Sequence, residues 1–278
     1  MRSEQRDVVN ARKPSLWWNQ PLTLVEGCTR CSAGCKDCWA LALEARSGAG
    51  RDVPPERTIR LRRDRLDEPL RWRKPRVVAV WNDLFHPDVP YAFQRDTFLM
   101  MNEPDCERHT FIVLTKRSCG AQGFHDTWND QEWLARPWSP WRENIILGVT
   151  CESDEYLWRV DTLLATPAAC RFVNAHLLGP LGLTPVAFGG YPESDEWARH
   201  PGHGIDWLAI ECNRPFRGDP AEWWGWCEAL VDQATAAGVP VWVKQGPTAT
   251  GGVTHDIAEF PVACRRREFP NLKGASDE

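Results

Sequence analysis

The chain has 278 residues, a formal net charge of −5 and 26% charged residues. This size accommodates one large α/β domain, and the negative charge argues against a broad electrostatic grip on nucleic acid, although a local basic groove remains open. We expect a cytoplasmic protein without a signal peptide or membrane contact, because no apolar run approaches the roughly 20 residues that span a bilayer and residues 1–7 precede no apolar stretch.

Short apolar runs rich in valine and isoleucine alternate along the chain with helical patterns. The expected strands are 22–25, 77–81, 110–114, 145–149, 171–174, 207–210 and 239–244. The expected helices are 38–47, 91–102, 154–165 and 222–237, the last of which ends before Gly238. This alternation predicts a mostly parallel sheet with right-handed crossovers.

These elements predict an α/β fold over residues 1–278 as a single domain. A complete or partial (β/α) barrel is the preferred arrangement, and an open doubly wound sheet is the competing one. Residues 1–15 and 272–278 are polar, and we expect them to be frayed tails. Residues 184–204, with Gly189-Gly190, His200 and His203, are expected to be an insertion.

Four cysteines fall within eleven residues, as Cys28-x2-Cys31-x3-Cys35-x2-Cys38. In a reducing cytosol, such clustering favours a metal centre over disulfides. Cys28, Cys35 and Cys38 could hold a [4Fe–4S] cluster with one iron free to bind S-adenosylmethionine. All four cysteines could instead form a closed zinc site. The spacing leaves these readings open, together with a fully ligated electron-transfer cluster and buried cysteines without metal.

Polar side chains follow the expected strands, and the carboxyl ends of parallel strands form the active-site edge of such folds. Lys116 and Arg117 could hold a carboxylate or phosphate there, or face solvent. Glu152 could accept a hydrogen bond from a cofactor, and Lys244 on an apolar strand needs a partner. The candidate cofactor-binding residues are Asp83, His86, Glu152, His176, Glu211 and Lys244.

Two features admit a nucleic-acid or nucleotide ligand. Residues 57–76 are rich in arginine, and the chain has 16 tryptophans. Exposed tryptophans could stack on bases, and the basic run could contact a polyanion. The alternative for both is ordinary structure, namely core packing for the tryptophans and a solvated face for the arginines.

Further motifs recur along the chain in a recognisable order. Ser32, Gly34, Cys35 and Cys38 are followed by Asn-Asp-Leu-Phe-His at 82–86, Val-Leu-Thr-Lys-Arg at 113–117, Leu-Gly-Val-Thr-x-Glu at 147–152, Leu-Leu-Gly-Pro at 177–180 and Val-Lys-Gln at 243–245. In this order they resemble the phage Gp37/Gp68 family (DUF5131), and the resemblance covers nearly the whole chain.

The resemblance implies a radical S-adenosylmethionine enzyme with a barrel of that type. It assigns Cys28, Cys35 and Cys38 to a [4Fe–4S] cluster, and it implies S-adenosylmethionine and an electron donor as partners. Cys31 falls at a position that the family does not require to be cysteine. The substrate is unknown, with a nucleotide or nucleic acid as the candidate, and a partner protein is left open. The alternative function is a non-catalytic, zinc-stabilised module that binds nucleic acid or protein.

The chain also departs from the family pattern at strand ends. His176 lies near the position where the family has a glutamate before Leu-Leu-Gly-Pro, and residues 211–215 replace a glycine-rich segment. Lys36-Asp37 supplies no aromatic residue before the last cysteine. We therefore expect a shifted substrate or weakened chemistry.

Overall fold

The computed structural model describes residues 15–38, 40–42, 59–130, 139–183, 185–188 and 204–272. Within them, an eight-stranded sheet has the order β1-β4-β5-β6-β7-β8-β9-β10. The strands are β1 (Gln20–Thr23), β4 (Val77–Trp81), β5 (Thr110–Thr115), β6 (Ile145–Cys151), β7 (Cys170–Leu177), β8 (Trp207–Cys212), β9 (Val241–Pro247) and β10 (Val253–Thr254). All neighbours are parallel except β9 and β10. The expected α/β class is confirmed.

The strand order distinguishes between the barrel and the doubly wound sheet that the sequence left open. The eight strands lie side by side in the order in which they occur along the chain, whereas the strand order of a doubly wound sheet reverses at a switch point. The described residues therefore resemble a barrel wall more than a doubly wound sheet. Within them β1 and β10 are the edges, so the wall is not closed there.

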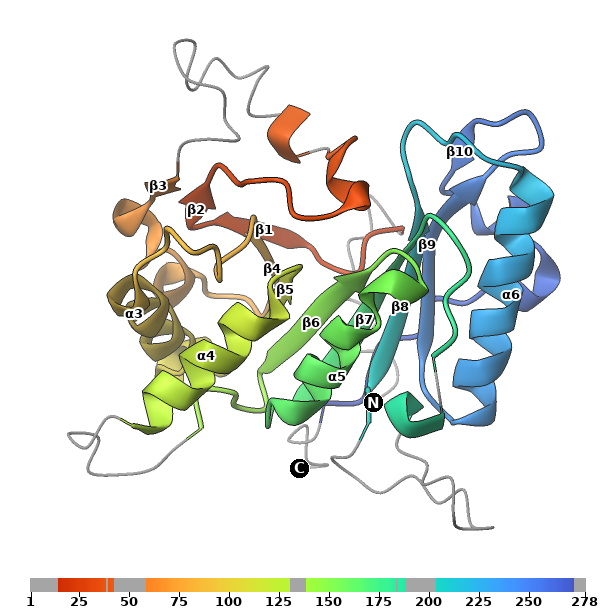
Figure 1. Ribbon diagram of the computed structural model, residues 1–278. Coiled ribbons are helices and arrows are strands. Elements are labelled where there is room, and N and C mark those ends of the chain that lie inside the picture. Colours follow the sequence, from red (N-terminus) through yellow and green to blue (C-terminus); the bar gives the residue numbers. More distant parts are fainter. Residues whose placement is uncertain are drawn as a thin grey trace.

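Four helices of the described residues are α3 (Tyr91–Met101), α4 (Ser118–Asn129), α5 (Trp158–Ala165) and α6 (Pro220–Ala236). Helices α3, α5 and α6 confirm three of the expected helices. The ends of α3 and α6 lie within two residues of the expected ends, and the first turn of the third expected helix is a separate 3-10 helix before α5. The expected helix 38–47 lies mostly outside the described residues, although 40–42 are helical. Figure 1 shows α4 and α5 in front of the sheet, α3 at the left and α6 beside β9.

Helix α4 was not expected from the sequence. Glycines at 120 and 123 mask its pattern, but Ala121, Phe124 and Trp128 recur at helical spacing and are buried. Gly120 allows a close approach, because a methyl group there would lie 2.9 Å from the carbonyl oxygen of Phe85.

The remaining elements are short. The expected strand 22–25 is divided into β1 and β2 (Val25–Glu26), and β2 pairs with β3 (Arg60–Leu61) in an antiparallel ribbon. The 3-10 helices are η1 (Ala33–Cys35), η3 (Arg63–Arg65), η4 (Pro69–Arg71), η5 (Pro104–Cys106), η6 (Asp154–Tyr156), η7 (Pro185–Phe188), η8 (Ile257–Glu259) and η9 (Val262–Cys264).

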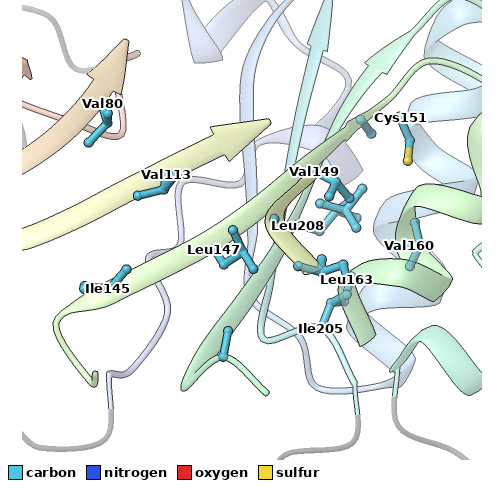
Figure 2. Close-up of a cluster of buried hydrophobic side chains, with 14 of the residues drawn as sticks. Val80, Val113, Ile145, Leu147, Val149, Cys151, Val160, Leu163, Ile205 and Leu208 are labelled. Atoms are coloured by element: carbon cyan, nitrogen blue, oxygen red, sulfur yellow. The ribbon is translucent and has the colours of Figure 1, made fainter. Parts of the chain in front are cut away.

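Apolar side chains cover both faces of the sheet. On the helix side, Leu147 and Val149 of β6 share a buried cluster with Val160 and Leu163 of α5 (Figure 2). The opposite face, called here the inner face, buries a second cluster of Trp17, Val77, Ile112, Ile146, Cys170, Phe172, Trp207, Ala209 and Trp242. Burial on both faces explains why the strands read as continuous apolar runs.

Segments near both ends of the described chain cover the inner face. The indole of Trp242 donates to the carbonyl of Ser15 at 3.1 Å, and the indole of Trp207 donates to the carbonyl of Glu268 at 2.9 Å. The aromatic cluster therefore fills the part of the inner face nearer the amino ends of the strands.

The inner face is polar near the carboxyl ends of the strands. Side chains alternate between faces, so Asn174 and His176 follow Phe172 onto the inner face. Glu211 follows Trp207 in the same way on β8, and Lys244 follows Trp242 on β9. These four residues, called here the polar layer, thus lie toward the carboxyl ends of three adjacent strands.

Some expectations fall outside the described residues. These include most of both expected tails, and most of the expected insertion at 184–204 with Gly189, Gly190, His200 and His203. The single-domain organisation stays a prediction. No helix in the described part of the chain has the length and apolar character needed to cross a membrane.

Candidate functional site

Residues 27–38, called here the cysteine loop, follow β2. Gly27 has a φ of 86°, a left-handed conformation that suits glycine and turns the chain out of β2. Cys28 and Cys38 are half-buried, Cys31 is exposed and Cys35 is buried. In Figure 1 this red-orange segment lies toward the end of the sheet where most of the parallel strands have their arrowheads.

Arg117 ties the start of the cysteine loop to the ends of β4 and β5. Its Nη1 donates to Asp83 Oδ2 at 2.8 Å and lies 3.5 Å from Cys28 Sγ. Its Nη2 donates to the carbonyl of Thr29 at 2.7 Å. Asp83 Oδ1 in turn accepts from Thr115 Oγ1 at 2.6 Å. The guanidinium therefore bridges a buried carboxylate and a cysteine sulfur.

His86 also contacts the cysteine loop. Its Nδ1 accepts from the backbone N–H of Asp88 at 3.1 Å, so Nε2 carries the proton and donates to Thr29 Oγ1 at 2.8 Å. Burial and the nearby Arg117 charge lower the pKa of His86. The ring is therefore neutral at pH 7, and it positions the loop as a hydrogen-bond donor.

Glu152 lies under the middle of the loop and is 0% exposed. Its Oε1 accepts from Lys116 Nζ at 2.6 Å and from the Ser32 hydroxyl. Its Oε2 accepts from Arg159 Nη1 at 2.7 Å. Lys116 Nζ also lies 3.6 Å from Cys35 Sγ. Lys116 and Arg117 thus pair with carboxylates of the chain itself, beside the cysteines, and their binding of a ligand carboxylate or phosphate stays a prediction.

The thiols differ in acidity. A hydrogen bond from Cys31, with help from Lys116, lowers the pKa of Cys35 to about 3 despite its burial. The same hydrogen bond and burial raise the pKa of Cys31. Burial raises the pKa of Cys28, although Arg117 opposes this. A thiolate at Cys35 beside an ammonium is the protonation state that metal ligation requires.

The polar layer forms a second group of interactions. Asn174 Nδ2 donates to Glu211 Oε1 at 2.9 Å, and Lys244 forms an ion pair with the other oxygen of Glu211. His176 Nε2 forms a hydrogen bond with Asn213 Oδ1. Burial raises the pKa of Glu211, but the Lys244 charge together with His176 and Asn174 outweighs it and lowers the pKa to about 2.

One buried oxygen of this layer lacks a partner. Asn174 is 2% exposed, and its Oδ1 accepts no hydrogen bond within the described residues. The amide orientation is set by Glu211, whose carboxylate can only accept and therefore faces Nδ2. A buried oxygen without a donor costs free energy, so a bound molecule or water with an N–H or O–H group would stabilise it.

The two groups are electrostatically connected. Burial lowers the pKa of His176, and the charges of Glu211, Lys116 and Glu152 also act on this ring. A charge on either group therefore influences the other. Together the cysteine loop and the polar layer form one candidate site along the carboxyl ends of the sheet.

Two of the cysteine sulfurs have cationic neighbours. Among the described residues, no group of three or more cysteine, histidine or carboxylate side chains is arranged to hold a metal ion. The thiolate ligands of an iron–sulfur cluster are stabilised by nearby hydrogen-bond donors. Arg117 at Cys28 and Lys116 at Cys35 are such donors. The donor set therefore fits a cluster.

All the candidate residues from the sequence lie in this region. Asp83, His86 and Glu152 contact the cysteine loop or its partners, while His176, Glu211 and Lys244 form the polar layer with Asn174. Cys38 closes the loop, where its carbonyl accepts from the N–H of Ala42 at 3.1 Å. Sequence reasoning missed the roles of Arg159, Ser32, Asn174 and Asn213. The sequence shows Arg159 only as an arginine within the expected helix 154–165, and its burial appears only in the structure.

The arginine run at 57–76 and the tryptophans, which suggested a nucleic-acid ligand, also have local contacts within the chain. Arg62 pairs with Glu26 and Asp64, Arg63 with Asp96, and Arg65 with Glu68. Most of the described tryptophans are buried or partly buried, and among them only Trp158, at 46%, is strongly exposed. Three arginines of the run thus have local partners, most of the described tryptophans pack within the fold, and a nucleic-acid ligand stays a prediction.

Comparison with known proteins gives one match. Neither a curated protein nor a solved structure matches the chain. A family model described as "Protein of unknown function (DUF5131)" matches residues 15–259, which span the sheet, the cysteine loop and the polar layer. The chain therefore belongs to the DUF5131 family, as the order of its motifs predicts.

Proposed function

We propose that the chain holds a [4Fe–4S] cluster on Cys28, Cys35 and Cys38 and acts as a radical S-adenosylmethionine enzyme. The observation that carries the proposal is the pair of cations at the sulfurs. Arg117 Nη1 lies 3.5 Å from Cys28 Sγ, and Lys116 Nζ lies 3.6 Å from Cys35 Sγ. Cationic donors stabilise thiolate ligands and tune the potential of a cluster.

The bound cluster would supply the electron that cleaves S-adenosylmethionine and yields a carbon radical. The chain's own residues bind and orient. Asp83 and His86 act through Arg117 and Thr29 to hold the start of the loop. His176, Glu211 and Lys244 line the polar layer and are the candidates for holding S-adenosylmethionine or the substrate. The buried aromatic cluster packs on the same face of the sheet, next to this layer toward the amino ends of the strands.

The chemistry of the polar layer supports a nucleobase, the polar and uncharged part of a nucleotide or of S-adenosylmethionine, as the group that it contacts. Glu211 and Lys244 neutralise each other, and Asn174 Oδ1 requires a hydrogen-bond donor. We retain a nucleotide as the candidate substrate, because base edges carry N–H donors and carbonyl acceptors that Asn174 and Lys244 could bind. An external electron donor is required by the chemistry.

Cysteine variants test the ligand assignment. Cys28→Ala, Cys35→Ala and Cys38→Ala should each lose iron and sulfide after anaerobic reconstitution, whereas Cys31→Ala should retain both. Cys119→Ala, at an exposed cysteine in α4, is the matched control. Full iron retention in any of the first three variants would remove that cysteine from the ligand set.

A second candidate is a zinc-stabilised binding module that uses all four cysteines. The hydrogen bond between Cys31 and Cys35 favours it, because it brings the fourth thiol beside a proposed ligand. In that case Cys31→Ala would reduce zinc affinity steeply, since metal binding and local folding are coupled. The same variant therefore separates the two candidates.

A further inference from the structure

The sequence predicts Glu152 as a cofactor ligand, but its contacts fit a different role. We propose that Glu152 is a positioning residue, and that the segment from Glu152 to Arg159 clamps residues 32–35 of the cysteine loop and sets the place of Cys35. The inference rests on the proposed function only for the identity of what Cys35 binds. The clamp itself is a property of the chain without any bound group.

The Glu152 carboxylate is buried, and its oxygens are already bonded to cations of the chain. It is 0% exposed, and each of its carboxylate oxygens already accepts from a cation. Lys116 reaches Oε1 from the end of β5, and Arg159 reaches Oε2 from α5. A ligand could bind this carboxylate only by displacing one of these cations.

Three consecutive residues of the loop meet the clamp, and the fourth, Cys35, contacts a lysine that the clamp holds. The Ser32 hydroxyl donates to Glu152, and the N–H of Ala33 donates to the Tyr156 hydroxyl at 3.2 Å. A methyl group at Gly34 would lie 2.7 Å from Glu152 Oε1, so only glycine fits there without a shift. Cys35 Sγ accepts from Lys116, which Glu152 holds.

The clamp is anchored on rigid elements. Glu152 directly follows the buried strand β6, and Arg159 Nη1 also donates to the carbonyl of Thr150 at 2.7 Å. The guanidinium of Arg159 lies over the Tyr156 ring, 4.3 Å from its centroid. Two cations and one carboxylate thus belong to residues in α5 or directly after β5 and β6. Removing one partner from such a buried ionic network is costly, because it leaves a charge buried without its counter-ion.

The test measures the alkylation rate of each cysteine in the full-length, metal-free protein with iodoacetamide, resolved by mass spectrometry. In Glu152→Gln, Lys116 and Ser32 lose their anionic acceptor, so buried Cys35 should react faster by roughly tenfold, the effect of losing one charge-assisted hydrogen bond. Exposed Cys119 in α4 is the internal reference and should keep its rate. Glu155→Gln, at an exposed carboxylate in the same segment, is the matched control.

A second variant approaches the same contact from the loop. Gly34→Ala pushes against Glu152 and should also raise the Cys35 rate, whereas Gly225→Ala, with no atom within 4 Å of the added methyl group, should not. Thermal unfolding of each variant separates local release from global loss of folding. Unchanged Cys35 rates in folded Glu152→Gln and Gly34→Ala would overturn the clamp.

The same variants distinguish the clamp from the proposed function. If purified protein carries zinc or no metal while the Cys35 rate rises as expected, the radical function fails and the clamp stands. If Glu152→Gln weakens S-adenosylmethionine binding and leaves the alkylation rates unchanged, Glu152 is a cofactor ligand and the clamp is wrong.

Discussion

Glu211 and Lys244 form an ion pair in the polar layer, and this pair should contribute to the stability of the protein. The carboxylate lies between the Lys244 ammonium and the Asn174 amide on the inner face of the sheet. Lys244→Met should destabilise the protein by about 3 kcal/mol, the lower end of the range for a buried pair, because it leaves a mostly buried carboxylate without its cation. The double variant Lys244→Met/Glu211→Gln should lose less. Urea unfolding measures both free energies, and equal losses would contradict the pairing.

The same carboxylate gives a pH dependence. The folded-state pKa of Glu211 is about 2, below the value of about 4.3 for an unfolded glutamate. Its contribution to stability is therefore present above about pH 4.3 and is lost as the pH falls toward about 2. The difference in unfolding free energy between the parent protein and Glu211→Gln should shrink across this window. A difference that stays constant would show that Glu211 titrates normally.

At this scale the sequence predicts some site residues and misses others for a physical reason. Asp83, Glu152 and Glu211 are polar residues at the ends of apolar strands, so the position of the strand is enough to find them. Asn174 and Arg159 are different, because their roles depend on the strand register and on the phase of a helix. Neither can be read before the elements are packed together.

Elements were predictable where their apolar pattern was strong. Strand β4 begins and ends as expected, whereas β7 continues to Leu177, beyond the expected end at 174. The polar side chains of Asn174 and His176 hide this extension, although the ladder to β8 continues past them. Helix α4 was missed because its two glycines lower helix propensity, while Phe124 and Trp128 stabilise the helix through burial.

Two glycine positions test this view of the elements. A methyl group at Gly148 would lie 1.9 Å from Phe172 Cε1, so Gly148→Ala should cost at least about 1–3 kcal/mol through overpacking. Gly123→Ala has no atom within 4 Å and should stabilise α4 by about 0.5–1 kcal/mol. Chemical denaturation of both variants measures the difference. A stabilised Gly148→Ala would show that β6 and β7 do not pack as described.

Across the whole molecule, sequential parallel strands bring the cysteine loop and the polar layer to one end of a single sheet. The alternation of strands and helices is enough to predict this end, because parallel strands share a direction. The alternation cannot predict closure of the wall, which depends on the tilt and stagger of all the strands together. The aromatic cluster on the inner face likewise depends on segments that are distant in the chain, such as Trp17 and Trp207.

Iron and sulfide analysis of anaerobically purified protein, followed by incubation with dithionite and S-adenosylmethionine, tests the central claim most directly. A radical S-adenosylmethionine enzyme should be a brown protein with about four irons and four sulfides per chain, should bleach on reduction and should cleave S-adenosylmethionine to 5′-deoxyadenosine. A colourless protein with one zinc and no cleavage of S-adenosylmethionine would contradict it. The carboxyl end of the sheet would then be a binding surface beside a structural metal.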